Sequence, residues 1–231
     1  MVKHLTITVL NDNEPCLGLK NDWGWSVFLQ SEKWNILFDA NQDPEVIKYN
    51  SKKLGVDLTR TSFAVLSHFH ADHYAGFEYI AKIKPKLNVY VPLDNNNFLK
   101  DWGLNTITVS QGLMLASDVW SSGSVKSNDS FNIAEQALGV KLDGKELIVI
   151  VGCSHPGVDV LVEKLKILTK QDVFLVVGGF HKPSRNVLDN LALMVKHICP
   201  AHCSGSEAKN YVKAKYKEKY CLVKTGLKMR F

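Results

Sequence analysis

The sequence predicts an α/β protein in which short strands alternate with amphipathic helices. Three observations predict this class. Short apolar runs recur along the chain, most of them precede segments with apolar residues at helical spacing, and no internal repeat or break in composition divides the 231 residues. Hydrophobic residues make up 45% of the chain and charged residues 22%, as in ordinary globular proteins. We therefore expect a single domain that spans residues 1–231.

The elements follow from local patterns. Residues 5–9 alternate apolar and polar side chains, and Val27–Leu29 and Ile36–Phe38 are short apolar runs, so the first forty residues predict strands. Next come a strand at Phe63–Leu66, a helix with Tyr74, Phe77, Ile80 and Ile83 at helical spacing that ends before Pro85, and a strand at Asn88–Val91. Strands are also predicted at Leu147–Val151, Val173–Val177 and Leu222–Met229.

Three helices are predicted in the second half of the chain. The first starts at Pro156, whose missing N–H costs nothing in a first turn. The second follows the Val173–Val177 strand, and the third is rich in lysine and is capped by Ser206. Their apolar stripes are Val158, Leu161, Val162, Leu165 and Leu168 in the first helix, and Leu188, Leu191, Ala192 and Val195 in the second.

Composition excludes several classes of protein. No apolar run approaches the roughly 20 residues that cross a bilayer, and the amino-terminal residues resemble a strand rather than an export signal. We expect a cytoplasmic protein with no membrane partner. The five cysteines have no framework spacing and predict reduced thiols. The net charge of +5 comes largely from lysines near the C-terminus and predicts a solvated helix face, so no nucleic-acid partner is expected.

The histidines are placed in a pattern. Five of the eight, together with two aspartates, lie just beyond the carboxyl end of a predicted strand, and His202 follows the short segment at Ile198 in the same way. In open α/β sheets, ligands bind in the crevice outside the carboxyl ends of the strands. The residues in these positions are Asp39, His68, His70, Asp72, His73, His155 and His181.

The densest cluster is the HxHxDH motif at residues 67–73. A tight turn between a strand and a helix can direct two imidazoles toward one cation, and the carboxylate and last imidazole toward a second. Imidazole suits zinc or iron, and an oxygen donor among nitrogens is typical of an open catalytic site. The motif therefore predicts a metal centre.

In the stretch SHFHADHYAG, this motif resembles the central metal motif of the metallo-β-lactamase superfamily. The aspartate in ILFDA and the histidine in PAHCSG fit the wider pattern. The stretches EQALGV, VGCSHPGV, GGFH and AHCSG resemble the branch that includes the archaeal dihydropterin / ribofuranosylaminobenzene phosphate synthase. The resemblance covers the chain from about residue 21 onward. It implies a four-layered αββα sandwich of two mixed β-sheets, with the metals at one edge.

The resemblance also implies two divalent metal ions, zinc as first choice and iron or manganese as alternatives. The ligands would be His68 and His70 for the first metal, and Asp72, His73 and His202 for the second. Asp39 would accept a hydrogen bond from an imidazole and orient it.

Two positions depart from the superfamily pattern. Cys153 stands where a metal-bridging aspartate is usual, and it is either a ligand or a small buried side chain. No histidine lies between His73 and His155, so the third ligand of the first metal is His155 as first choice and Glu135 as second. His181 follows two glycines and is either a ligand or a proton donor. The other cysteines near His202 are interpreted as bystanders.

These residues predict a binuclear hydrolase in which a metal-bound hydroxide attacks an ester, amide, lactone or phosphoester. Asp72 and His181 would be catalytic. The substrate would be a small molecule, and an anionic or phosphorylated molecule is one candidate. Trp23, Trp25 and Trp120 are candidates to line its opening. One alternative is a pterin-type synthase that joins a dihydropterin pyrophosphate to an aminobenzene ribofuranosyl phosphate. Another is an iron-containing redox protein.

Overall fold

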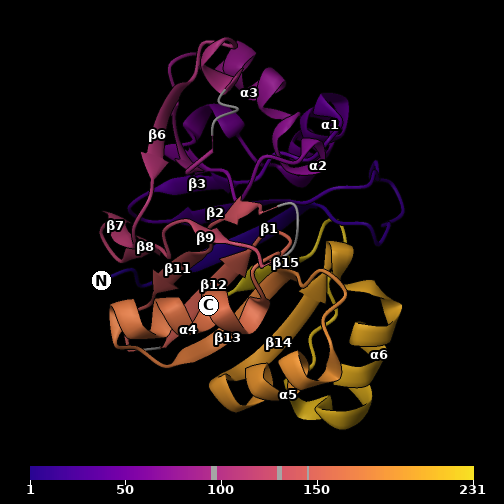
Figure 1. Cartoon of the computed structure of the whole chain (residues 1–231). Coiled ribbons are helices and arrows are strands. Elements are labelled where there is room, and N and C mark those ends of the chain that lie inside the picture. Colours follow the sequence, from indigo (N-terminus) through magenta and orange to yellow (C-terminus); the bar gives the residue numbers. More distant parts are fainter. Residues whose placement is uncertain (95–97, 129–131, 145) are drawn as a thin grey trace. The chain divides into compact units, whose positions relative to one another are not determined.

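The computed structural model describes residues 1–94, 98–128, 132–144 and 146–231 (Figure 1). The chain forms two compact units. The N-terminal unit comprises Lys3–Thr108 and Lys224–Phe231, and the C-terminal unit comprises Met1–Val2 and Val109–Val223. Each unit is built on one large mixed β-sheet, which confirms the predicted class of an α/β protein with two mixed sheets. The expectation of a single domain over residues 1–231 stays a prediction.

The N-terminal unit contains a sheet of seven strands among the described residues. In their order across the sheet they are β15 (Lys228–Arg230), β1 (Leu5–Asn11), β2 (Ser26–Ser31), β3 (Asn35–Phe38), β4 (Phe63–Val65), β5 (Asn88–Pro92) and β6 (Asn105–Val109). Neighbours from β15 to β3 are antiparallel, whereas β3, β4 and β5 are parallel. The carboxyl ends of β3 and β4 therefore share one edge of the sheet. The strand β3 leads to Asp39, and β4 leads to the HxHxDH motif.

The helices of this unit are α1 (Pro44–Leu54), α2 (Ala71–Tyr74) and α3 (Phe77–Ile83), with 3₁₀ turns η1 (Leu58–Arg60) and η2 (Phe98–Lys100). The helix α1 begins at an Asp43 cap, whose side chain accepts the Glu45 N–H, and ends at Gly55 in a left-handed conformation. Apolar residues of α1, α3 and the strands form one buried cluster, which anchors the helices on the sheet.

The C-terminal unit has a six-stranded sheet and a two-stranded ribbon within the described part of the chain. The sheet order is β14 (Val195–Ala201), β13 (Val173–Gly179), β12 (Leu147–Val151), β11 (Leu138–Lys141), β8 (Val119–Ser121) and β7 (Leu113–Ala116), and the ribbon pairs β10 (Ala134–Glu135) with β9 (Val125–Lys126). The strands β12, β13 and β14 are parallel, so their carboxyl ends also share one edge. Every residue of β12 is buried, as its continuous apolar run indicates.

Three helices pack on this sheet: α4 (Val158–Thr169), α5 (Arg185–Met194) and α6 (Gly205–Lys215). Their buried residues join alternate residues of β12 in one apolar cluster, as the alternation of side chains along a strand requires. The turns η3 (His202–Ser204) and η4 (Lys217–Lys219) flank α6. No helix among the described residues is long and apolar enough to span a membrane.

Several predicted boundaries are wrong. The helix predicted through Tyr74 and Ile83 is two helices, α2 and α3, and Val195 begins β14 instead of belonging to α5. The cap of α6 is Ser204 rather than Ser206, and the Ser204 hydroxyl donates to the Ala201 carbonyl instead of accepting from the helix. The helix α4 starts at Val158, two residues after Pro156. Only Lys228–Arg230 forms the last strand, because a turn at residues 225–226 interrupts the predicted run.

Candidate metal-binding residues

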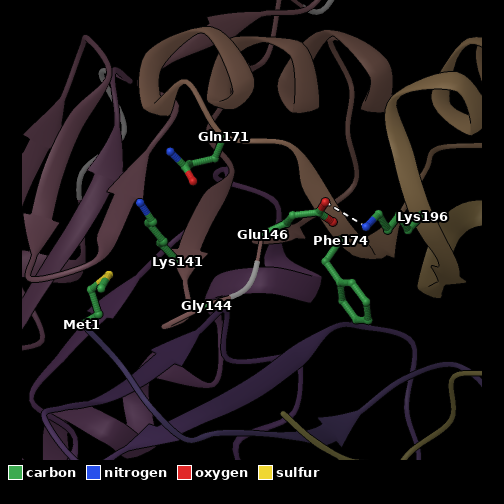
Figure 2. A pocket seen from close by; sticks show the side chains of 7 residues that line it. All are labelled: Met1, Lys141, Gly144, Glu146, Gln171, Phe174 and Lys196. Atoms are coloured by element: carbon green, nitrogen blue, oxygen red, sulfur yellow. Dashed lines mark ion pairs between the residues drawn. The ribbon is translucent and has the colours of Figure 1, made fainter.

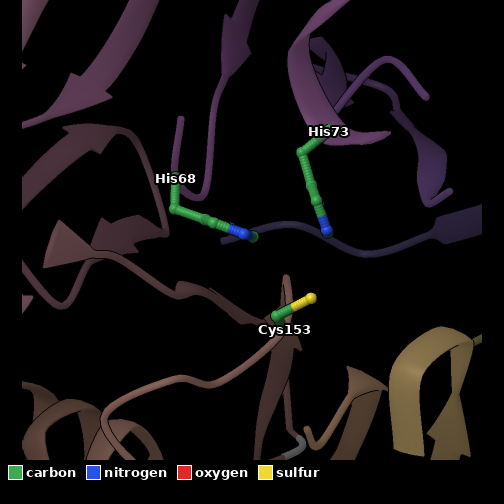
Figure 3. Close-up of side chains that lie close together, drawn as sticks. All are labelled: His68, His73 and Cys153. Carbon is green, nitrogen blue, oxygen red and sulfur yellow. The ribbon is translucent and has the colours of Figure 1, made fainter. Parts of the chain in front are cut away.

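Three imidazoles gather in the N-terminal unit, two of them in the loop between β4 and α2 and the third, that of His73, in α2 itself. His68 and His73 are fully buried and their ring centroids lie 4.2 Å apart. Figure 3 shows their rings extending from two points of this segment. His70 is the residue before α2, and its Nδ1 lies 3.1 Å from His68 Nε2. Two imidazole nitrogens this close can share only one proton between them, so the cluster suits a cation that accepts lone pairs.

Asp39, the residue after β3, holds these rings through a buried hydrogen-bond network. Its Oδ2 lies 2.7 Å from His73 Nδ1 and accepts the Ser67 hydroxyl at 2.7 Å, and its Oδ1 accepts the Ser67 N–H at 2.7 Å. The Ser67 hydroxyl oxygen lies 2.9 Å from His68 Nδ1. With a proton on Nδ1, each of these two rings would present its Nε2 to a cation, as metal-ligating histidines do.

Asp72 lies in the first turn of α2, where its Oδ2 accepts the indole N–H of Trp23 at 2.9 Å. The same oxygen is 3.8 Å from His73 Nε2. Trp23 is 55% exposed, so its ring lies largely at the surface while its N–H bonds to Asp72. Trp25 is fully buried, and the prediction that it lines a substrate opening is wrong. Trp120 packs at the margin of the C-terminal core.

The C-terminal unit carries further donors on the loops after its three parallel strands. Cys153 and His155 follow β12, and Figure 3 shows the thiol of Cys153 at this strand end. His181 follows β13, and His202 is the first residue after β14. The donor atoms of Cys153, His155 and His181 lie within 4.8 Å of one another, and the rings of His155 and His181 are 4.2 Å apart. Neighbouring parallel strands thus bring together donors from distant parts of the sequence.

Several of these loop residues have a left-handed backbone. The φ angles are 53° at Asp39, 63° at Ser154, 49° at His181 and 44° at His202. Such a conformation costs a residue with a side chain on the order of 1–3 kcal/mol and persists only where surrounding contacts hold it. The conformation recurs after four strand ends and sets the direction in which the chain leaves each strand.

Glu135, the second choice for the third ligand of the first metal, binds backbone groups in the structure. Its carboxylate is fully buried on β10 and accepts three backbone N–H groups of the loop after β12. Oε1 accepts from Cys153 at 2.8 Å and from Ser154 at 2.7 Å, and Oε2 accepts from His155 at 2.8 Å. Glu135 belongs to none of the donor groups found among the described residues. The geometry makes it a residue that positions this loop.

Cys203, which the sequence analysis set aside, lies beside Cys153. Their Sγ atoms are 3.2 Å apart, and all five cysteines are free thiols. The neighbouring Cys153 thiol lowers the pKa of Cys203 well below its ordinary value, with further lowering by the imidazoles of His181 and His202. Burial raises the pKa of Cys199, another buried thiol of the same unit, well above its ordinary value. The two environments favour thiolate at Cys203 and thiol at Cys199.

The C-terminal unit also has a cavity of about 600 Å³ at the opposite ends of β12, β13 and β14 (Figure 2). An ion pair of 2.8 Å joins Glu146 to Lys196 in its wall. The lining residues are Met1, Lys141, Gly144, Glu146, Gln171, Phe174 and Lys196. This lining contains no histidine or cysteine, so the cavity is separate from the predicted metal ligands.

The structure is an α/β protein with groups of side chains that could hold a metal ion, and comparison with known families identifies its class. The family model of the metallo-beta-lactamase superfamily matches residues 24–168, well over half of the chain. The chain therefore belongs to the metallo-beta-lactamase superfamily. The matched range includes Asp39, the motif at residues 67–73 and Cys153, whereas His181 and His202 lie beyond it.

Particular relatives are distant. The chain is 24% identical to the 7,8-dihydropterin-6-methyl-4-(beta-D-ribofuranosyl)-aminobenzene-5'-phosphate synthase of Methanocaldococcus jannaschii, over 86% of this chain and 85% of that protein. It is 27% identical to an uncharacterized protein of the same organism, over 87% and 91% of the two chains. Among solved structures, it is similar to Tm1679, a metal-dependent hydrolase of the beta-lactamase superfamily, with a TM-score of 0.79, 23% identity, and coverage of 97% and 98%.

Members of this superfamily usually bind divalent metals, and the donors found here suit such ions. Imidazole nitrogen, carboxylate oxygen and thiolate sulfur are the three ligand types that proteins use for zinc. Each unit carries its donors on loops at the carboxyl ends of parallel strands. The residues present therefore fit the metals that the superfamily implies.

Proposed function

We propose that the chain is a hydrolase that depends on two divalent metal ions, zinc first and iron or manganese as alternatives. The bond cleaved would be an ester, amide, lactone or phosphoester of a small molecule. Anionic and phosphorylated molecules are among the candidate substrates. The proposal keeps the ligands assigned from the sequence. These are His68, His70 and His155 for one metal and Asp72, His73 and His202 for the other, with Cys153 as a further ligand.

The observation that carries the proposal is the network around Asp39. One buried carboxylate and one serine hydroxyl contact the Nδ1 atoms of two fully buried imidazoles, an arrangement that would present the Nε2 atom of each ring to a metal. Histidines that only fill a core have no need of such control. Orientation of metal-ligating histidines by a carboxylate is the usual arrangement around protein-bound metals.

The remaining polar groups have roles that their surroundings support. Metals bound here would supply Lewis acidity and lower the pKa of a coordinated water toward about 7. The Trp23 N–H holds one oxygen of Asp72 and so orients the carboxylate, which we assign to accept a proton from the attacking nucleophile. His181 is exposed and lies against the His155 ring, a setting from which an imidazole can protonate a leaving group.

Metal analysis combined with a hydrolase panel tests this proposal. Protein purified without chelator should carry close to two equivalents of transition metal, and His68→Ala and His73→Ala should lose both metal and activity. His4→Ala changes a histidine that belongs to no donor group among the described residues and should behave as the parent protein. The panel contains phosphodiester, lactone and thioester substrates. Well under one metal per chain, with activity unchanged in His68→Ala, would contradict the proposal.

A second candidate is a synthase reaction like that of the archaeal relative. The 24% identity over most of both chains favours it, because a branch of the superfamily is then shared. In this reaction the metals would activate a pyrophosphate leaving group of a dihydropterin for carbon–carbon bond formation, without attack by water. Turnover of a dihydropterin pyrophosphate with an aminobenzene ribofuranosyl phosphate, in a protein inactive on every panel substrate, would replace the hydrolase proposal with this one.

A further inference from the structure

We propose that Cys203 is a metal ligand, and that with Cys153 and His202 it forms a two-thiolate, one-imidazole donor set contained in the C-terminal unit. The inference rests on the proposed function in one respect, since it requires that the chain binds a metal. It goes further because it adds a ligand that the sequence analysis set aside and specifies the chemical class of the metal.

The two thiols come from strands that are not neighbours. Cys153 lies two residues after β12 and Cys203 two residues after β14, and β13 runs between these strands. Strands two places apart in a sheet are separated by roughly 9–10 Å. The Sγ atoms nevertheless lie 3.2 Å apart, so both side chains lean across the end of β13.

A glycine on β13 makes this approach possible. A Cβ added to Gly179 would lie 2.7 Å from Cys203 Sγ and 3.2 Å from Cδ2 of His202, closer than side chains normally approach. The same Cβ would meet the Gly152 carbonyl oxygen at 2.5 Å. The end of β13 therefore has no side chain at the one place where the thiol and the imidazole need room.

Both loops are held by bonds that do not involve the sulfur atoms. The Glu135 carboxylate binds the backbone of the loop after β12, and the Ser154 hydroxyl donates to the Gly179 carbonyl at 2.8 Å. On the other side, the Ser204 hydroxyl donates to the Ala201 carbonyl at 2.6 Å and accepts the Phe180 N–H at 3.0 Å. The thiols are thus brought together by two independently supported loops, as expected of preorganised ligands.

The dimensions of the cluster suit a tetrahedral ion. The donor atoms of Cys153, His202 and Cys203 lie within 4.8 Å of one another. Zinc bonds of about 2.3 Å to sulfur and about 2.0–2.1 Å to nitrogen place tetrahedral ligands roughly 3.5–3.8 Å apart. The observed sulfur separation of 3.2 Å needs only a small opening to reach that range. A disulfide would instead require the sulfurs to approach to about 2.05 Å.

A second thiol pair in the same unit provides an internal comparison. Cys199 on β14 is buried and contacts the Cys221 thiol, yet neither cysteine belongs to a donor group among the described residues. Cysteines that only fill space need no imidazole beside them, whereas Cys203 has His202 next to it. Two thiolates and an imidazole select soft or borderline ions such as zinc, iron(II), cobalt(II) and cadmium over magnesium and manganese.

Cobalt(II) titration of the metal-free protein tests the inference, because thiolate ligands produce an intense near-ultraviolet charge-transfer band that imidazole and carboxylate do not. The molar intensity of the band should fall about twofold in Cys203→Ser and in Cys153→Ser, since each removes one of two thiolates. Cys221→Ser, the matched control, should keep the full band. Circular dichroism checks that each variant folds.

A measurement on the unaltered chain covers the case in which a variant does not fold. Zinc should protect Cys153 and Cys203 from alkylation and leave Cys16 reactive, as read by peptide mass spectrometry. A full band in Cys203→Ser, alkylation of Cys203 in the presence of zinc, or a Cys153–Cys203 disulfide in the purified protein would overturn the inference. Bound cobalt without a thiolate band, lost in His68→Ala, would overturn the inference and remove Cys153 from the proposed ligands, and the proposal of a metal-dependent hydrolase would otherwise stand. Absence of any metal binding would overturn both.

Discussion

Replacement of Glu135 by glutamine tests how the loop after β12 is held. In the parent protein both carboxylate oxygens are used: one accepts two backbone N–H groups and the other accepts one. Glutamine keeps a single acceptor oxygen and adds an NH₂ group. The amide nitrogen would then face a backbone N–H, donor against donor, inside a fully buried site.

The expected loss of stability follows from these three bonds. A hydrogen bond to a charged group contributes about 1.5–3 kcal/mol, and a buried donor left without an acceptor costs about 1–3 kcal/mol. At least one such bond is lost in Glu135→Gln, and the remaining bonds have a neutral amide oxygen as acceptor instead of a charged carboxylate. We expect the free energy of unfolding to fall by about 3 kcal/mol, and Tm to fall by roughly 6–12 °C for a chain of this size.

Thermal and urea unfolding followed by circular dichroism measure this change. Glu146→Gln is the matched control, because Glu146 forms an ion pair with the exposed Lys196 and should contribute less than about 1 kcal/mol. If Glu135→Gln lost no more stability than this control, the carboxylate would not be holding the loop and the reasoning would be refuted. A loss of cobalt affinity in Glu135→Gln, without loss of the charge-transfer band at saturation, is expected as well.

Three further predictions concern other parts of the chain. Asp39→Asn should weaken metal binding by about 10–100-fold in competition with a chromophoric chelator, because the amide holds the His73 ring in the required tautomer less well; unchanged affinity would contradict this. Gly179→Ala should lower stability by about 1–3 kcal/mol in urea unfolding, since its methyl group overlaps a carbonyl oxygen and a cysteine sulfur, whereas full stability would show that the strand end can shift. Hydrogen bonds from the Lys215 ammonium, and to a lesser extent from the hydroxyls of Tyr216 and Tyr211, lower the pKa of Asp189 to about 2. Because this pKa is lower in the folded state, the contribution of Asp189 is present above about pH 4 and is lost as the pH falls toward 2. The difference in Tm between the parent and Asp189→Asn should therefore shrink over that window, and a difference that grew would contradict the assignment.

The elements that local pattern predicts best are those with the strongest apolar signal. The strand Leu147–Val151 has its predicted bounds, because every residue is buried and Gly152 follows directly. The helix α1 is absent from the predicted elements, since its buried face contains Asn50 and Ser51 beside two apolar residues and the apolar period is weak. Its signal lies in the caps, with Asp43 before the helix and Gly55 after it.

For the site too, the sequence predicts the features that depend on neighbouring residues and misses those that depend on distant ones. The HxHxDH motif and the strand-end histidines are local features, and the structure places them after the expected strands, with Asp72 and His73 in the short helix α2 and His202 in the turn η3. Glu135 and Cys203 were assigned by proximity in sequence alone, one as a second-choice ligand and one as a bystander. Their contacts depend on residues 18 to 20 positions away for Glu135 and 50 positions away for Cys203. The sequence predicts Trp23 only as an aromatic ring that lines a substrate opening. Its bond to Asp72 joins residues 49 positions apart.

The sequence by itself determined the class of fold and the kinds of donor atom, because hydrophobic periodicity and a dense histidine motif act over a few residues. Tertiary structure decided which groups contact the Nδ1 atoms of His68 and His73, which carboxylate holds which loop, and which thiols meet. The physical reason is that hydrogen bonds and sulfur contacts are made at about 3 Å, whereas strand order, register and a single missing side chain at Gly179 decide which distant residues come that close.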